Sequence, residues 1–162
     1  MPQHNIEPIF NENSQILILG SFPSVKSREG QFFYDHPQNR FWKVLARLFD
    51  EPVPETHPQK RAFLLNHRIA LWDVLASCEI TGSSDSTIKD TVPNDLTPIL
   101  QTAPIKAVFC NGNAAHQFYE RYTLQKTGMQ AIKLPSTSPA NAAFSLDKLV
   151  ENWRVILPYL ED

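Results

Sequence analysis

The chain has 162 residues, 42% of them hydrophobic and 20% charged, with a formal net charge of −2. This composition excludes fibrous and intrinsically disordered proteins, and the length suits one core, so we expect residues 1–162 to form a single domain. No stretch reaches the roughly 18 to 20 apolar residues of a membrane span, and the first residues lack a secretion pattern, so we expect a cytoplasmic protein without a membrane partner.

Four short apolar segments predict β-strands, at residues 15–20, 68–72, 105–110 and 130–134. Each is rich in Ile, Leu or Val and is bounded by turn residues. Helical patterns lie between and after them, at residues 39–49, 60–67, 93–100, 114–122 and 145–160. Pro93 stands near the start of the third helix, and Ser145 opens the last. This alternation predicts an α/β protein, a three-layer α/β/α sandwich with a four-stranded parallel central sheet.

The loops that leave the carboxyl ends of the strands are the expected ligand site, because ligands bind there in such sheets, near the point where strand order reverses. These loops follow Gly20, Trp72, Cys110 and Leu134. The first spans residues 20–38, far longer than the usual connection of about 2 to 6 residues. Long loops in compact domains are often functional, so the first loop is the leading candidate.

Aromatic and basic residues gather in and after the first loop. Phe32, Phe33 and Tyr34 suit stacking on a flat nucleobase, which contributes roughly 1 to 3 kcal/mol per base. Filling the core is the alternative, above all for Phe32. Between residues 20 and 47 five cations face two anions, which predicts a basic face on an acidic protein; ordinary solvated charges would give the same count. The cations are Lys26, Arg28, Arg40, Lys43 and Arg47.

The two cysteines predict neither a disulfide framework nor a metal cage. Cys78 and Cys110 lie far apart and in no C-x-x-C pair. We expect both to be small buried hydrophobic residues. Cys110 as a nucleophile is the alternative, but no catalytic partner can be named for it. We expect no metal and no cofactor.

The segment from residue 20 to residue 44 resembles the uracil-DNA glycosylase superfamily. HPQNRFW (36–42) matches at six positions the His-Pro-x-Asn-Arg-Phe-Trp stretch of the mismatch-specific uracil glycosylases. GSFPS (20–24) and LPSTSPAN (134–141) look closest to the hypoxanthine-DNA glycosylases, which cut deoxyinosine. LWDVLASC (71–78) and FCNGNAA (109–115) follow in the family's order, so the likeness covers most of the chain.

The resemblance implies a monofunctional DNA glycosylase that hydrolyses the N-glycosidic bond of a deaminated base during base excision repair. Hypoxanthine is the first candidate base, with uracil and xanthine after it. The expected partner is DNA that contains deaminated bases, bound by a monomer. Two alternatives stay open: a non-catalytic DNA-binding module of the same fold, and a hydrolase of free nucleosides.

Asn39 is the catalytic residue that the resemblance implies. The mismatch-specific enzymes place a water-positioning Asn before the first proline, where this chain has Phe22. In the hypoxanthine family the Asn of the His-Pro-x-Asn stretch is catalytic, and it corresponds to Asn39. We expect its amide oxygen to accept from the attacking water while its nitrogen donates elsewhere. Capping of the helix that begins at Arg40 is the alternative, and the two roles are compatible.

Base binding is expected from Phe22, Tyr34 and Asp73. Tyr34 occupies the place where the superfamily stacks an aromatic ring on the flipped base. Asp73 stands where the superfamily reads the edge of the base, and its carboxylate could accept from a ring N–H or cap the following turn. His36 could brace the loop or donate to base or phosphate, and we favour loop support.

DNA contact is expected from small polar residues of the first and fourth loops. In LPSTSPAN, hydroxyl groups between prolines resemble the superfamily motif that contacts phosphates beside the flipped nucleotide. An ordinary proline-rich turn is the alternative. Leu134 stands where uracil glycosylases commonly have a His that assists the departing base, so strong assistance of that kind is not expected. The expected DNA-binding residues are Ser21, Ser136, Thr137, Ser138 and Asn141.

Overall fold

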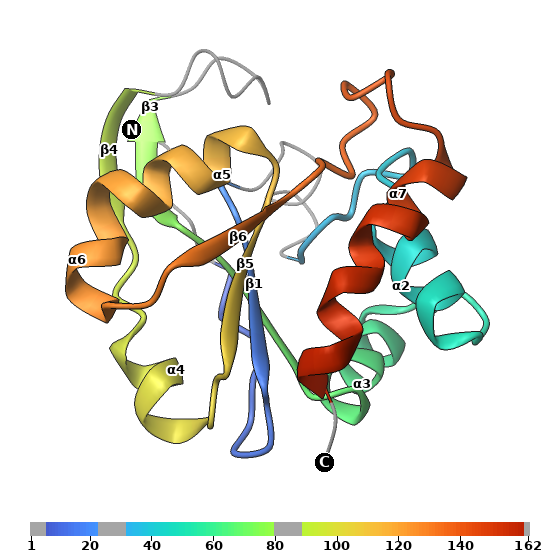
Figure 1. The fold of residues 1–162 in the computed structure, drawn as a ribbon, viewed down its shortest axis with the longest axis horizontal. Coiled ribbons are helices and arrows are strands. Elements are labelled where there is room, and N and C mark those ends of the chain that lie inside the picture. The colour runs from blue at the N-terminus through green and yellow to red at the C-terminus, as the bar shows by residue number, and fades with distance from the viewer. Residues whose placement is uncertain (1–5, 23–31, 80–88, 161–162) are drawn as a thin grey trace.

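The central sheet of the computed structural model has four parallel strands, as the sequence predicts. Residues 6–22, 32–79 and 89–160 are described. The strands are β1 (Ile16–Gly20), β2 (Ile69–Asp73), β5 (Ala107–Asn111) and β6 (Ala131–Leu134), and they lie in the order β2-β1-β5-β6 (Figure 1). Each predicted strand is confirmed, with bounds that differ by at most two residues.

Helices cover both faces of this sheet (Figure 1). One face carries α2 (Phe41–Phe49), α3 (His57–Asn66) and α7 (Leu146–Trp153). The other carries α4 (Thr97–Thr102), α5 (Asn113–Phe118) and α6 (Leu124–Thr127). A π-helix, η2 (Tyr119–Thr123), joins α5 to α6, and a 3-10 helix, η3 (Arg154–Leu160), follows α7. The predicted three-layer α/β/α arrangement is therefore confirmed.

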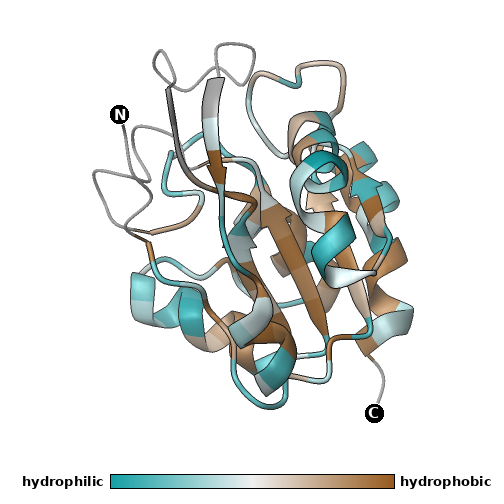
Figure 2. Ribbon diagram, turned by 90° about the vertical axis from the view of Figure 1, so that its left-hand side faces the viewer, coloured by the Kyte–Doolittle hydropathy of each residue, from teal (hydrophilic) through white to brown (hydrophobic). Residues whose placement is uncertain are grey.

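Strand β1 is buried on both faces, because its side chains alternate between two hydrophobic cores. Ile16 and Ile18 belong to the first core, with side chains of α2 and α7, whereas Leu17 and Leu19 belong to the second, with side chains of α4 and α5. All four are fully buried. The hydrophobic strands are seen between more polar helices in Figure 2. This burial explains why the strand reads as a continuous apolar run.

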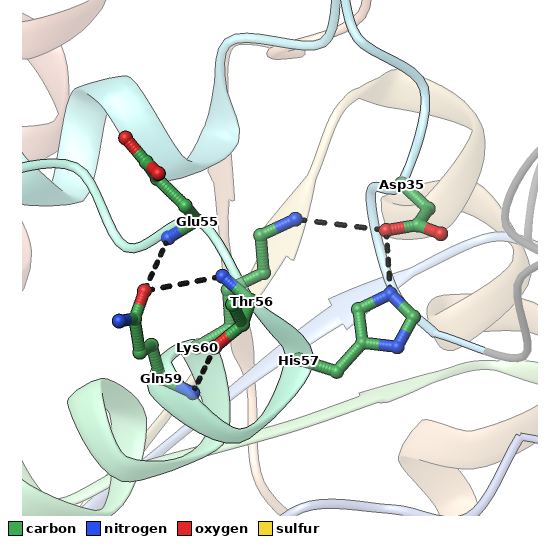
Figure 3. A network of polar contacts seen from close by, with 6 residues as sticks. All are labelled: Asp35, Glu55, Thr56, His57, Gln59 and Lys60. Atoms are coloured by element: carbon green, nitrogen blue, oxygen red, sulfur yellow. Dashed lines mark hydrogen bonds and ion pairs between the residues drawn. The ribbon is translucent and has the colours of Figure 1, made fainter.

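Local capping signals set the starts of two helices. Ser145 Oγ accepts from the Lys148 N–H at 3.2 Å and begins α7, as predicted. Helix α3 begins three residues before its predicted start because Thr56 and Gln59 form a capping box (Figure 3).

Three predicted helices differ from those observed. Helix α4 begins at Thr97 instead of near Pro93, which ends strand β4. The helix expected at residues 114–122 contains the π-turn η2, and the long C-terminal helix becomes a 3-10 helix at Arg154. The sequence also missed a two-stranded antiparallel sheet of β3 (Leu75–Glu79) and β4 (Lys89–Pro93). None of the described helices is long and apolar enough to cross a membrane.

Candidate active site

The site expected from the sequence lies at the carboxyl edge of the sheet, where strand order reverses. β1 pairs with β2 on one side and with β5 on the other. The parallel register sets Gly20 beside Asp73, and farther along the same edge Asn111 beside Leu134. The strand ends therefore bring the first, second, third and fourth loops to one edge.

Asp73 and Tyr34 both lie against Gly20. A Cβ atom at position 20 would overlap Oδ1 of Asp73 and lie 3.0 Å from the Tyr34 hydroxyl. Asp73 is only 3% exposed, and its backbone carbonyl accepts from Asn94 Nδ2 at 2.9 Å. The structure therefore brings together two of the three residues expected at the base, and only glycine leaves room for both at the end of β1.

Tyr34 is held in a left-handed backbone conformation, with φ of 51°. This conformation costs a bulky residue on the order of 1 to 2 kcal/mol, and such residues cluster at functional sites. Its ring stacks on Phe41, the first residue of α2, with 4.2 Å between ring centroids and 22° between planes. Phe41 in turn meets Trp153 of α7 edge to face at 5.8 Å. One face of the Tyr34 ring is thus supported by the first core.

Asn39 uses its amide oxygen within the protein. Oδ1 accepts from the Phe41 backbone N–H at 2.9 Å and from the Thr137 hydroxyl at 2.9 Å. The first bond satisfies the first N–H of α2, as the capping alternative expects, but Asn39 stands one residue before the N-cap, Arg40, whose own side chain makes no capping bond. Within the described ranges no residue accepts from Nδ2, and the side chain is half-buried. The orientation is therefore opposite to the expected one, in which the oxygen accepts from water.

Thr137 lies inside the protein and not on a DNA-facing surface. Its side chain is 0% exposed. Its hydroxyl accepts from Asn111 Nδ2 at 3.0 Å, and its backbone N–H donates to Asn111 Oδ1 at 3.1 Å. A buried hydroxyl with these partners does not reach a phosphate, so the expected DNA contact of Thr137 does not fit this structure.

The rest of the fourth loop is built by its own polar side chains. Ser136 Oγ accepts from the Ser138 N–H, and Ser138 Oγ accepts from the Ala140 N–H, both at 3.1 Å. Asn141 Nδ2 donates to the Ser136 carbonyl at 3.0 Å. Each serine oxygen is an acceptor in these bonds, so each hydroxyl hydrogen can still be donated to a ligand.

Arg40 fastens the fourth loop to the start of α2. Its guanidinium donates to the carbonyls of Phe144, Ser138 and Asn141, and its backbone N–H donates to the Thr137 carbonyl at 3.0 Å. The bonds to Ser138 and Asn141 measure 2.9 and 3.0 Å. The guanidinium of Arg40 is thus occupied by carbonyl groups of the protein. The sequence did not predict these contacts.

Two of the three described cations of the expected basic face make contacts within the protein. Besides Arg40, Arg47 is paired with Asp147 at 2.8 Å. Lys43 is exposed, whereas Lys26 and Arg28 lie outside the described residues.

Residues 32–36 are attached to α3 by an ion-pair cluster (Figure 3). Asp35 contacts His57 Nε2 at 3.0 Å and Lys60 Nζ at 3.6 Å. Phe32 stacks on the His57 ring at 4.5 Å and is buried, as the core alternative for this residue requires. These contacts fix the approach of the first loop to Tyr34.

His36 contacts the turn that leads to Asn39. Its Nδ1 accepts from the Gln38 N–H at 3.1 Å, and its carbonyl accepts from the Asn39 N–H at 3.0 Å. Both bonds shape the His36–Asn39 turn from within.

Ser21 and Phe22 are largely buried. Each is 8% exposed, and Phe22 belongs to the second core. The Ser21 carbonyl accepts from the Leu75 N–H at 3.1 Å. A bound base would meet only the small exposed part of the Phe22 ring.

Cys110 is a core residue and not a nucleophile. Its side chain is fully buried, and burial, with a smaller effect of the Glu120 carboxylate, raises the pKa of the thiol to about 12. The thiol is therefore protonated at neutral pH. Among the described residues no group of three or more His, Cys, Asp or Glu side chains is arranged to hold a metal ion.

Sequence reasoning missed Asn111 and Arg40, and it gave Thr137 a different role. Asn111 is an amide at the carboxyl end of a central strand, next to a glycine, and this position is the sequence signal that could have found it. Gly112 has φ of 98°, and a Cβ there would lie 3.2 Å from Ser136 Cβ. The close approach of the third and fourth loops thus depends on this glycine.

Comparisons with known proteins agree with this geometry. A family model described as the uracil DNA glycosylase superfamily matches residues 7–160. A hypoxanthine DNA glycosylase of Methanosarcina acetivorans is 34% identical over 96% of this chain and 98% of its own length. One of Methanosarcina barkeri is 33% identical over 87% of this chain and 89% of its own length.

The structural comparison gives the same family. The solution NMR structure of a proposed uracil DNA glycosylase from Methanosarcina acetivorans superimposes with a TM-score of 0.83 at 34% identity, with all of both chains covered. This match extends over the sheet, the helices on both faces and the loops that carry Tyr34, Asn39 and Asp73. The chain belongs to the uracil DNA glycosylase superfamily.

Proposed function

We propose that this protein is a monofunctional DNA glycosylase that removes a deaminated base from DNA, with hypoxanthine as its preferred base and uracil and xanthine as further candidates. Two relatives named hypoxanthine DNA glycosylase support the choice of base. Each aligns with this chain over most of the length of both proteins. The observation that carries the proposal is the group formed by Tyr34, Asp73 and Asn39 at the carboxyl edge of the sheet.

Tyr34 and Asp73 have the properties needed to bind a flipped base. The ring of Tyr34 rests on Phe41 with one face, and an aromatic ring held in this way is suited to stacking on a base. The carboxylate of Asp73 can accept from a ring N–H, which both hypoxanthine and uracil carry. Gly20 leaves room for Asp73 and Tyr34 at the same place, so stacking and edge reading act on one base.

The reaction is a hydrolysis. The bond between C1′ and the base nitrogen breaks, and its electron pair leaves with the base while the sugar becomes cation-like. A water oxygen then bonds to C1′, and the proton that the water loses ends on the released base. Hydrogen-bond donors that face the departing base lower the barrier because they stabilise its developing negative charge. Asn39 is the residue that we assign to catalysis.

DNA contact is proposed for Ser136, Ser138 and Asn141 of the fourth loop, with Ser21 at the first. The two serine hydroxyls keep a hydrogen that a phosphate oxygen can accept. Thr137 is not part of this set because it is buried. We further propose that the protein acts as a cytoplasmic monomer.

The test is base release from labelled duplexes that contain inosine, uracil or xanthine, with alkali used to cut the abasic product. We expect cleavage of the inosine duplex and its loss in Asn39→Ala. No cleavage of any duplex would contradict the proposal. Faster release from free inosine than from the duplex would indicate a nucleoside hydrolase, and binding without release would indicate a non-catalytic DNA-binding module.

A further inference from the structure

We infer that Thr137 and Asn111 are positioning residues that turn the amide nitrogen of Asn39 toward the substrate, so that Asn39 acts as a hydrogen-bond donor to the departing base. This inference rests on the proposed function in one respect, the assignment of Asn39 to catalysis. It assigns a role in the reaction to two side chains that do not themselves reach the substrate.

The directions of the hydrogen bonds follow from groups that can only donate. The Thr137 backbone N–H faces one end of the Asn111 amide, so that end is Oδ1. The other end, Nδ2, then donates to the Thr137 hydroxyl oxygen. Because that oxygen accepts from Asn111, its one hydrogen is left for Oδ1 of Asn39, which lies 2.9 Å away.

A second fixed donor acts on the same atom of Asn39. The Phe41 backbone N–H, at the start of α2, also points at Oδ1. Turning the amide over would set Nδ2 against two donors at once and would leave both without an acceptor. The orientation of the amide is therefore set by α2 and by the fourth loop together.

Burial makes this orientation difficult to change. Thr137 is 0% exposed, so water does not replace its hydroxyl as the donor. The Arg40 N–H bonds to the Thr137 carbonyl at 3.0 Å, which holds the residue next to the start of α2. The link between the third loop, the fourth loop and Asn39 is thus enclosed in the protein.

The consequence concerns what Asn39 can do in the reaction. An amide oxygen has two acceptor sites, and both are used by Phe41 and Thr137. The oxygen is therefore not available to accept a hydrogen bond from the attacking water. The nitrogen donates to no described residue, and a ring nitrogen or carbonyl oxygen of the departing base is the acceptor that gains charge as the bond breaks.

Four substitutions separate this account from one in which the oxygen of Asn39 orients water. Asn39→Asp keeps the acceptor oxygen and replaces the donor by a second acceptor. Thr137→Val removes the hydroxyl at nearly constant shape, and Thr137→Ser keeps it. Asn111→Asp keeps the acceptor for the Thr137 N–H but removes the donor, so the threonine hydrogen can turn toward Asp and away from Asn39.

The first measurement is single-turnover release of hypoxanthine from an inosine duplex. We expect Asn39→Asp to be about 100-fold slower or more, close to Asn39→Ala, as when a transition-state donor is lost. Thr137→Val and Asn111→Asp should each slow the chemical step by about 10-fold, with duplex affinity within about 2-fold. Thr137→Ser should restore the rate, and Thr137→Val should add no loss to Asn39→Ala. Melting temperatures identify any variant that fails to fold.

The second measurement does not depend on activity. In ¹⁵N-labelled protein the side-chain amide signals of Asn39, identified by their loss in Asn39→Asp, should shift in Thr137→Val and Asn111→Asp and stay in place in Thr137→Ser. If the parent releases no base from any duplex, the proposed function fails while this spectrum still tests the orientation. Parent-like rates in Asn39→Asp or Thr137→Val would overturn the inference. Unshifted Asn39 signals in both Thr137→Val and Asn111→Asp would also overturn it.

Discussion

Two of the contacts that join the segment from Phe32 to Arg40 to the rest of the protein differ in chemistry. Asp35 contacts His57 and Lys60 of α3 at a partly exposed position. Asn39 contacts Thr137 and the start of α2 through neutral groups, one of them fully buried. The first contact holds the loop in place, whereas the second sets which atom of a side chain faces the site.

The two contacts also differ in how they can fail. Asp35 has two partners in parallel, so the loss of His57 leaves Lys60 in place. At the other contact, a chain of hydrogen bonds runs from Asn111 through Thr137 to Asn39. The loss of one of these bonds therefore removes the constraint on the next side chain. We therefore expect changes at the buried contact to affect catalysis and changes at the ion-pair cluster to affect stability alone.

The largest effect is expected at Asn39. Asn39→Ala should lower kcat by about 10²- to 10³-fold, because it removes the donor that faces the base. Loss of the cap on α2 should also lower the free energy of unfolding by about 1 kcal/mol. Asp35→Asn is the matched control on the same loop and should keep kcat within about 3-fold, as expected for a partly exposed ion pair. Equal losses of kcat in the two variants would contradict the comparison.

The next effect is expected at Gly20. Gly20→Ala places a methyl group where Oδ1 of Asp73 lies and near the Tyr34 hydroxyl, so it should lower kcat/KM by about 10-fold or more and cost about 1 to 3 kcal/mol through overpacking. Gly128→Ala is the control, since nothing lies within 4 Å of a Cβ there, although its φ of 69° also costs stability. Base release measures kcat/KM, and urea unfolding measures the free energy of unfolding, for both variants. A fully active Gly20→Ala would argue against base reading by Asp73.

Arg40 should matter for stability more than its neighbour Arg47. Arg40→Lys loses most of the fork that donates to three carbonyls, and we expect the free energy of unfolding to fall by about 2 kcal/mol. Arg47→Lys, at an exposed pair with Asp147, should change it by less than about 0.5 kcal/mol. Urea unfolding measures the difference, and similar values for the two variants would show that the carbonyl contacts of Arg40 contribute little.

A smaller effect is expected at the ion-pair cluster. Asp35→Asn should lower the free energy of unfolding by about 0.5 to 1 kcal/mol in dilute buffer, as expected for partly exposed pairs. The difference from the parent should shrink in 1 M NaCl, because salt screens such pairs. Unfolding by urea at both salt concentrations tests this, and a loss that does not depend on salt would assign the effect to packing against Phe32.

The smallest effect is expected at Cys110. Because burial raises the pKa of the thiol to about 12, the folded protein should not react there with thiol reagents at pH 8, and treatment should leave the activity of a Cys78→Ala variant unchanged. Mass spectrometry measures the labelling of Cys110, and base release from the duplex measures the activity. Rapid labelling of Cys110 with loss of activity would mean that the second core opens readily.

The sheet could be predicted from the sequence because its strands are continuous apolar runs between turn residues. The β3–β4 pair could not, since LASCE and KDTVP carry neither such a run nor a clear alternation. Tyr34, Asp73 and Asn39 were found through the resemblance and through their places after strands. The burial of Thr137 depends on the hydrogen bonds by which Arg40 holds the fourth loop next to α2. No local sequence pattern indicates these long-range bonds. The bond of Asn39 to the start of α2 could be foreseen, but the direction of its amide is set by Thr137, 98 residues away.

The most direct test of the account is single-turnover release of hypoxanthine from an inosine duplex by Asn39→Asp beside the parent protein. The account predicts a rate about 100-fold lower or more in the variant, because the amide donor is gone while the capping oxygen remains. A rate equal to or above that of the parent would contradict it, since a carboxylate at position 39 would then serve as well as the amide.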